Sequence, residues 1–364
     1  MPGFQERISV AEAIEQPLVS RSEKRGSAYW DSIYTGHNLQ LTFHGWDLKN
    51  NKGPTQLFFT SDALVMHMRE SSLRRFNCKD KSFDECDFVG EYISEAPRQE
   101  ISFGKCRFER CDFEGSVWRS VKFSECIFEK CSFTLTEFHD CTFYKCEWTD
   151  ITLSGTETKL PNTLITNPTK FINSAYTNLD KHILNEKKKD FEYQKMRLEG
   201  TKAKLSRVIL KNAENHGDDD AYYDAIKTYL KQSIKSKMQI SSYEIKKKKG
   251  YLKQSLNLVA GFFELLILNI TGAVNCWGKS IARPALIGML ITLSFGSIYG
   301  FIANDFKLGL VKGFDITFLV GYTKHSLPTC PLLMQALYGL NAFFGLWWYA
   351  ILVPTLINRV SRVN

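Results

Sequence analysis

The stretch that decides the fold runs from Ile101 to Phe133 and reads ISFGKCRFERCDFEGSVWRSVKFSECIFEKCSF. A large apolar residue returns at every fifth position, and this spacing continues in both directions, from residue 83 to residue 153. Those fifteen positions hold ten Phe and two Trp, together with Ile93, Leu153 and one exception, Arg98. A helix has a period of about 3.6 residues and a strand a period of about 2, so neither accounts for a period of five. A solenoid does, because each unit can form one side of a squared coil and turn one large side chain inward.

Seven cysteines keep the same register, each two residues before an in-phase position, where a second and smaller inward side chain belongs. They are Cys86, Cys106, Cys111, Cys126, Cys131, Cys141 and Cys146. Such a set is compatible with a metal cluster or a disulfide framework. We favour small buried side chains, because thiols spread along a coil wall do not converge on one ion. Reduced thiols also fit an intracellular compartment, and we expect no metal and no cofactor.

The period of five resembles that of the pentapeptide-repeat family, whose fold is a right-handed quadrilateral β-helix. The resemblance implies a β-solenoid over residues 81–155. The residues before it, 1–80, show no clear period, and we interpret them as an N-terminal lead-in or cap. Glu91 falls on an inward position and Pro97 removes a backbone donor. We therefore expect a bulge or loop at residues 91–99. The family's fold carries no single chemistry.

Charge is unevenly divided along the chain, whose formal net charge is +8. Residues 81–153 carry fifteen acidic and nine basic side chains, so the remainder of the chain carries +14. A basic run at Lys246–Lys249 precedes a long apolar segment. In that position the run favours an anionic membrane surface over nucleic acid as its binding partner. A solvated helix face has the same composition. The first sixteen residues lack the apolar core of a secretory signal.

Residues 156–250 predict a closing turn and a helical hairpin. The first helix is expected from Leu179 to Ala213 and the second from Asp219 to Lys249, with Gly217 as a C-cap between them. The words VILKNAENHGDDDAYYDAIKTYLKQ resemble the segment that, in some pentapeptide-repeat membrane proteins, joins the solenoid to the bilayer.

The last part of the chain, residues 251–364, predicts an α-helical two-span membrane module. Pro284–Ala303 is twenty residues without a charge and Leu332–Ile357 is twenty-six, and about twenty suffice to cross a bilayer. Leu256–Trp277 is also apolar but contains Glu264 and three Asn. A central carboxylate is costly in a bilayer, so we favour an interfacial helix and keep a third crossing as the alternative.

Basic residues predict the orientation of a multi-pass protein of the cell (inner) membrane. Lys253, Lys279 and Arg283 precede the first span together with the lysine run, and Arg359 follows the second. Because short cytoplasmic loops are enriched in Lys and Arg, both termini and the solenoid are expected in the cytoplasm.

The loop between the two spans, residues 304–331, reads NDFKLGLVKGFDITFLVGYTKHSLPTCP. Its Val-Gly-Tyr, between two spans and followed by Pro, resembles the pore loop of two-transmembrane potassium-channel subunits, whose filter is Thr-Val-Gly-Tyr-Gly. The resemblance implies a homotetramer with a pore at its axis. It implies filter-like roles for Leu319, Val320, Gly321, Tyr322 and Thr323, an outer-mouth role for Lys324, and inner-helix roles for Gly339 and Gly345.

Three departures from that filter alter the expected selectivity. Such a filter aims backbone carbonyls at the ion and uses Gly where the backbone needs positive φ. Thr323 replaces the second Gly, Leu319 removes a hydroxyl, and Lys324 stands where the family usually has Asp, so that like charges repel cations. We predict an ion-channel-like pore with altered or poor potassium selectivity. A channel-like fold that conducts little, and a loop that only connects two spans, stay open.

Other functional classes find little support. There is no phosphate-cradling Gly loop, nucleophile elbow or catalytic dyad, and we expect no enzyme. His325 and Cys330 share a loop, but two ligands do not make a zinc site. The alternative function is a membrane-anchored interaction scaffold, in which the solenoid binds a cytoplasmic protein partner. Basic residues interrupt the acidic solenoid, so DNA mimicry is disfavoured and no nucleic acid is expected.

Overall fold

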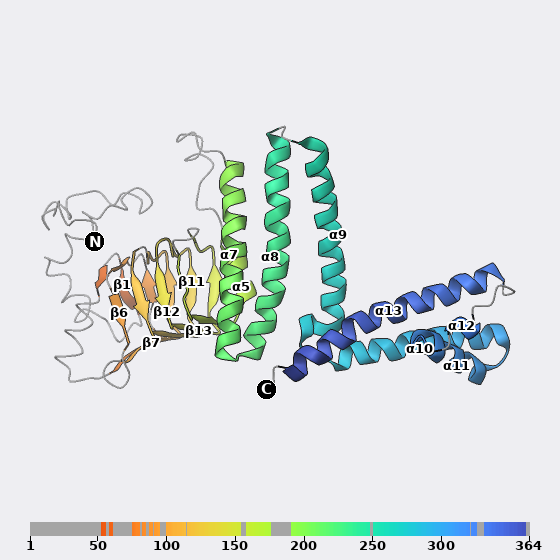
Figure 1. Ribbon diagram of the computed structural model, residues 1–364. Helices are drawn as coiled ribbons and strands as arrows, with labels where there is room; N and C mark the ends of the chain where they lie inside the picture. The colour runs from red at the N-terminus through yellow and green to blue at the C-terminus, as the bar shows by residue number, and fades with distance from the viewer. Residues whose placement is uncertain are drawn as a thin grey trace, which may run out of the picture. The chain divides into compact units, whose positions relative to one another are not determined.

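Figure 1 shows the computed structural model of the chain. It describes residues 52–55, 58–60, 75–80, 82–84, 87–89, 91–94, 100–113, 115–153, 158–175, 191–247, 250–320, 322–325 and 331–361. Cys86, Arg98, Gly321 and most of the predicted lead-in lie outside these ranges. The chain divides into two compact units, Met1–Gly261 and Phe262–Asn364.

Short parallel strands stack into the sheets of the first unit, as a β-solenoid requires (Figure 1). The sheet orders are β1-β4-β8-β11-β14, β15-β13-β10-β7-β3, β12-β9-β6 and β2-β5. Phe123 is paired with Phe103 on one side and Phe143 on the other, which sets twenty residues per coil. The strands are β1 (Lys52–Thr55), β2 (Phe58–Thr60), β3 (Arg75–Lys79), β4 (Ser82–Asp84), β5 (Asp87–Val89), β6 (Glu91–Ile93), β7 (Glu100–Gly104), β8 (Arg107–Glu109), β9 (Val117–Arg119), β10 (Lys122–Ser124), β11 (Ile127–Glu129), β12 (Glu137–His139), β13 (Thr142–Tyr144), β14 (Glu147–Thr149) and β15 (Leu164–Ile165).

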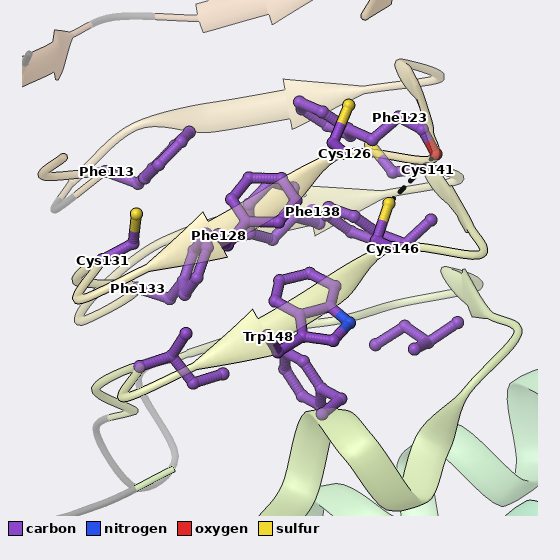
Figure 2. Packing of buried hydrophobic residues seen from close by; sticks show 14 of the residues in the cluster. Phe113, Phe123, Cys126, Phe128, Cys131, Phe133, Phe138, Cys141, Cys146 and Trp148 are labelled. Atoms are coloured by element: carbon purple, nitrogen blue, oxygen red, sulfur yellow. Dashed lines mark hydrogen bonds between the residues drawn. The ribbon is translucent and has the colours of Figure 1, made fainter. Parts of the chain in front are cut away.

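The in-phase aromatic residues form columns of stacked rings inside the solenoid (Figure 2). Phe128 lies between Phe108 and Trp148, with ring centroids 4.8 and 4.5 Å away and nearly parallel planes. Neighbouring columns meet edge to face, as Phe128 meets Phe133 at 5.7 Å. These geometries are the favoured ones for aromatic pairs, so the repeat stacks one ring on another at the spacing of adjacent strands.

The six cysteines of the repeat that the structure describes are buried, as predicted, and none of these six forms a disulfide. Each thiol has a backbone acceptor; the Cys146 thiol, for example, donates to the Phe123 carbonyl oxygen at 3.4 Å (Figure 2). Hydrogen bonding with Cys106 and Cys146, together with burial, raises the pKa of Cys126 far above its ordinary value. These thiols are therefore small core side chains with satisfied hydrogen bonds.

The repeat register shifts at β6, where the period of five placed Ile93 inward. The structure corrects this: Tyr92 is buried and stacks on Trp118 with centroids 3.9 Å apart, while Ile93 is half-buried and Glu91 is exposed. The shift keeps the Glu91 carboxylate in water, where burial would be costly, and buries the larger ring. The sheets also begin earlier than residue 81, since β1 and β2 pair with β4 and β5.

The C-terminal end of the solenoid is closed by α5 (Pro168–Ser174) and by two longer helices, α7 (Phe191–His216) and α8 (Asp219–Lys246). The Asn212 side chain of α7 donates to the carbonyl oxygens of Leu160 and Thr163, at 2.6 and 3.0 Å. Solenoid and helices share one continuous apolar core. Two helices lie where the hairpin is predicted, and α8 ends three residues before the predicted Lys249.

Caps separate the two hairpin helices, with Gly217 after the end of α7 and Asp218 before the start of α8. Gly217 adopts a φ of 66°, which suits a residue without a side chain, and the Asp218 carboxylate accepts a hydrogen bond from the amide of Ala221. The segment from residue 176 to residue 190, where the first helix was expected to begin, lies outside the described ranges.

Helices make up the second unit. They are the later part of α9 (Tyr251–Asn275), the short turn η1 (Cys276–Gly278), α10 (Ala282–Ala303), α11 (Phe306–Thr317), α12 (Tyr322–His325) and α13 (Leu332–Ser361). Three of the described helical segments are long and apolar enough to cross a membrane: Tyr251–Gly278, Ala282–Ala303 and Leu332–Ser361. Large apolar side chains are exposed along all three. The length, composition and exposed apolar side chains of these helices therefore indicate membrane association.

Candidate functional site

The short helix α11 lies directly against α10, and glycines make the contact. A Cβ atom on Gly309 would lie 2.2 Å from the amide nitrogen of Gly300, and one on Gly313 would lie 2.7 Å from the Cα atom of Gly296. Both helices thus carry Gly-x-x-x-Gly, and their backbones touch without intervening side chains. Small residues at this spacing are typical of close helix crossings in membranes.

The C-terminal end of α11 is attached to α13 by a buried polar contact. The Thr317 hydroxyl donates to the Asn341 side-chain oxygen at 2.8 Å, and both residues are fully buried. A Cβ atom on Gly345 would lie 2.2 Å from the Thr317 carbonyl oxygen. The Tyr299 hydroxyl of α10 donates to the Leu337 carbonyl oxygen of α13 at 3.3 Å. Polar groups inside apolar helices thus join α10, α11 and α13.

The predicted filter-like residues follow the end of α11. Leu319 leaves the helix in a left-handed conformation with a φ of 59°, and the Val320 side chain is 74% exposed. Tyr322 and Thr323 begin α12, but their side chains lie outside the described set. The Lys324 side chain is exposed.

The two inner-helix glycines differ from each other. Gly345 touches the backbone of α11, whereas a Cβ atom on Gly339 would meet nothing within 4 Å. The structure therefore brings Gly345 to the candidate site and leaves Gly339 in open space.

Sequence reasoning missed the residues that hold this site together. Asn341 is a polar residue within a long apolar run, which is itself a signal for a functional or structural contact. The two Gly-x-x-x-Gly pairs were equally readable. The contact between Asp315 and His325, 3.2 Å apart, had no signal, because nothing in the sequence says that the loop folds back on the helix.

Comparison with known proteins bears on the solenoid. Residues 103–147 match the family model of pentapeptide repeats, in nine copies. The match falls on the stretch with the most regular stacking, from β7 to β14, and does not extend into the helices. No curated protein matches the chain.

The outer surface of the pentapeptide-repeat solenoid carries charge pairs, some within one strand and some between successive coils. The Arg107 guanidinium contacts Glu109 at 3.3 Å and Glu129 at 2.5 Å. Glu137 accepts hydrogen bonds from Lys159 at 2.5 Å and from His139 at 2.9 Å, and these bonds, that of Lys159 above all, hold the pKa of Glu137 below its ordinary value.

Exposed pairs of this kind contribute only about 0–1 kcal/mol each. They leave a surface of mixed charge. Within the ranges that the structure covers, no three His, Cys, Asp or Glu side chains gather as metal ligands.

Proposed function

We propose that the protein is a multi-pass protein of the cell (inner) membrane that passes ions through a homotetrameric pore. In this proposal α10 and α13 cross the bilayer, Leu319, Val320, Gly321, Tyr322 and Thr323 line the narrowest part, and Lys324 stands at the outer mouth. The solenoid, a right-handed quadrilateral coil, lies in the cytoplasm with both termini. There it acts as a sensor or as a docking surface for a protein partner.

The position of α11 along α10 is the observation that carries the proposal. With 12 residues, α11 is about 18 Å long, too short for a hydrocarbon layer of about 30 Å. Gly313 nevertheless lies against Gly296 and against the Thr292 carbonyl oxygen, near the middle of α10. If α10 crosses the bilayer, α11 enters the bilayer from the side where α10 has its C-terminal end, and it reaches the midplane. A helix that stops there, followed by a return loop, is the arrangement that ion filters use.

The electrostatics at the C-terminal end of α11 favour the passage of cations over anions. The C-terminal end of a helix carries a partial negative charge, and the end of α11 would place it at the bilayer midplane. Lys324 acts against this at the outer mouth, because four ammonium groups around one axis repel cations. Together with the departures at Leu319 and Thr323, this predicts altered or poor potassium selectivity.

We propose an interfacial position for α9, ahead of the two crossings. Its exposed large apolar side chains form a stripe at helical spacing, while Glu264 is exposed beside the stripe. A helix with one apolar and one polar face lies in the interface plane. The stripe is Tyr251, Leu252, Leu256, Val259, Phe262, Phe263, Leu266, Ile267 and Ile270.

Ion flux into liposomes that contain the purified full-length protein tests the pore. The wild type should pass monovalent cations with little preference between potassium and sodium. Thr323→Gly combined with Lys324→Asp should raise potassium flux about tenfold or more, because it restores a flexible carbonyl position and removes repulsion. Lys307→Asp, the same charge change at the exposed start of α11, is the matched control and should have little effect.

Absence of flux from a protein that is tetrameric by native mass spectrometry would overturn the pore and leave the membrane-anchored scaffold. One observation favours that alternative independently. The solenoid and the α7–α8 hairpin share one core, so the hairpin presents the solenoid as a rigid surface. A scaffold predicts no flux from any variant.

A further inference from the structure

Acidic residues are rare in the segment that contains both candidate spans. From Ala282 to Ser361 the sequence has only Asp305 and Asp315. Asp305 is the N-cap of α11, where its carboxylate accepts a hydrogen bond from the Leu308 amide at 3.1 Å. Asp315 lies at the opposite end, in the last turn of α11. Its position needs a separate explanation.

Local rules disfavour an aspartate at that place. A carboxylate near the C-terminal end of a helix meets the negative end of the helix dipole, and a carboxylate among apolar helices is costly unless it is paired. The structure supplies a partner: His325 Nε2, ten residues further on in α12, donates a hydrogen bond to Asp315 Oδ2 at 3.2 Å. The Asp315 side chain is only 29% exposed and the His325 side chain only 18%. The pair is therefore partly shielded from solvent, and solvent screens the attraction between the two groups less than it would at an open surface.

The contact completes a second attachment for the end of α11. On one side, Thr317 is bound to Asn341 of α13 at 2.8 Å. On the other, Asp315 is bound to His325 at the end of α12, the helix that begins with the last two filter-like residues. The chain leaves α11 through the left-handed residue Leu319, whose amide donates to the Ile316 carbonyl oxygen at 3.1 Å. The two ends of the filter-like segment are thus tied to each other and to α13.

We propose that Asp315 and His325 are positioning residues that fix the ends of the filter-like segment, and through them the ion selectivity of the pore. The part of this inference that concerns ion selectivity rests on the proposed function, whereas the part that concerns the ends of the segment does not. The pair acts through the backbone that it holds. Its loss should loosen the turn after α11 and change which ions pass.

A charge-swap cycle in the full-length protein tests the pair. Asp315→His and His325→Asp each leave two like side chains facing each other, and the double variant restores an acid opposite a base. In hydrogen exchange of the detergent-solubilised protein, each single variant should speed exchange of the Phe318 and Leu319 amides about 5- to 30-fold, the effect of losing 1–2 kcal/mol. The double variant should return to within about threefold of the wild type.

Two further variants serve as a replacement and as a control in the exchange experiment. Asp315→Asn keeps the size of the side chain and removes its charge, so it replaces Asp315→His if that variant does not fold. Lys324→Gln changes an exposed charge in the same short helix and should leave exchange unaltered. Single variants that exchange like the wild type, or a double variant as fast as the singles, would overturn the pair.

Flux distinguishes positioning from mere stabilisation. The potassium-to-sodium flux ratio in liposomes should shift in each single variant and return in the double variant. A ratio that stays constant while exchange changes would reduce the pair to a structural contact. If the wild type passes no ions at all, the proposed function fails and selectivity fails with it, whereas the exchange cycle still decides whether the pair holds the turn.

Discussion

Gly339 and Gly345 offer a matched pair of substitutions on one helix, because the structure separates two glycines that the sequence treats alike. Replacing either by Ala adds the same methyl group to α13 and gains the same helix propensity, about 1 kcal/mol. Only the surroundings differ. At Gly339 the new Cβ atom meets nothing within 4 Å, and at Gly345 it lies 2.2 Å from the Thr317 carbonyl oxygen.

The steric effect at Gly345 follows from that distance. Ordinary contacts to a Cβ atom begin at 3.4 Å, so the carbonyl has to retreat by about 1.2 Å. It belongs to the backbone of α11 and cannot rotate away as a side chain can. Its residue also holds the 2.8 Å hydrogen bond to Asn341. Overpacking of this kind costs about 1–3 kcal/mol, which is therefore the expected difference in unfolding free energy between the two variants.

Thermal melting of both full-length variants in one detergent measures the difference. Gly339→Ala should melt above the temperature of the wild type, and Gly345→Ala at or below it, because the overpacking cost equals or exceeds the propensity gain. Because the propensity gain is common to both, the gap between them reports the contact with α11. Equal melting temperatures, or a more stable Gly345→Ala, would show that α11 does not pack against α13 at this point.

Two predictions concern the solenoid. Burial raises the pKa of Cys141 to about 12, so its thiol should react slowly with an alkylating reagent in the folded protein at pH 8. Mass spectrometry of each peptide should show alkylation at least about 100-fold slower than at the half-buried Cys276. Comparable rates would contradict the buried column. Because the Lys159 hydrogen bond lowers the pKa of Glu137, the stability that its carboxylate contributes is present above the ordinary carboxyl pKa and disappears as pH falls through the lowered one. Glu137→Gln should therefore be slightly less stable than the wild type at pH 7, by about 1 kcal/mol or less in unfolding free energy. This difference should shrink toward zero as the pH falls through the lowered pKa; a gap that widens in acid would reverse the sign.

Much of the first unit could be predicted from its residues. A large side chain at every fifth position has no place in a helix or a flat strand, so the period itself implied stacked coils with rings and thiols inside. Where the period weakened, near Glu91, prediction failed by one residue, since only the stacked partner Trp118 decides that Tyr92 is the ring that enters the core. The strands before residue 81 lacked the period and were not foreseen.

The candidate site was less accessible to sequence reasoning. Length and apolar composition identified α10 and α13, and the likeness to a pore loop drew attention to Leu319–Thr323. Which glycines touch a neighbour, and which polar groups meet, depends on how three helices cross. That is a property of surfaces distant in the sequence, as the contact of Thr317 with Asn341 illustrates.

By itself, then, the order of residues determined the local rules of this protein: a coil wherever large side chains recur every fifth position, and a lipid-compatible helix wherever charges are absent for twenty residues. Tertiary structure alone decided that α11 lies backbone to backbone against α10, and that Asp315 finds His325. The physical reason is that periodicity and hydropathy are summed along the chain, whereas a close approach of two backbones or a paired carboxylate exists only once distant segments share the same space.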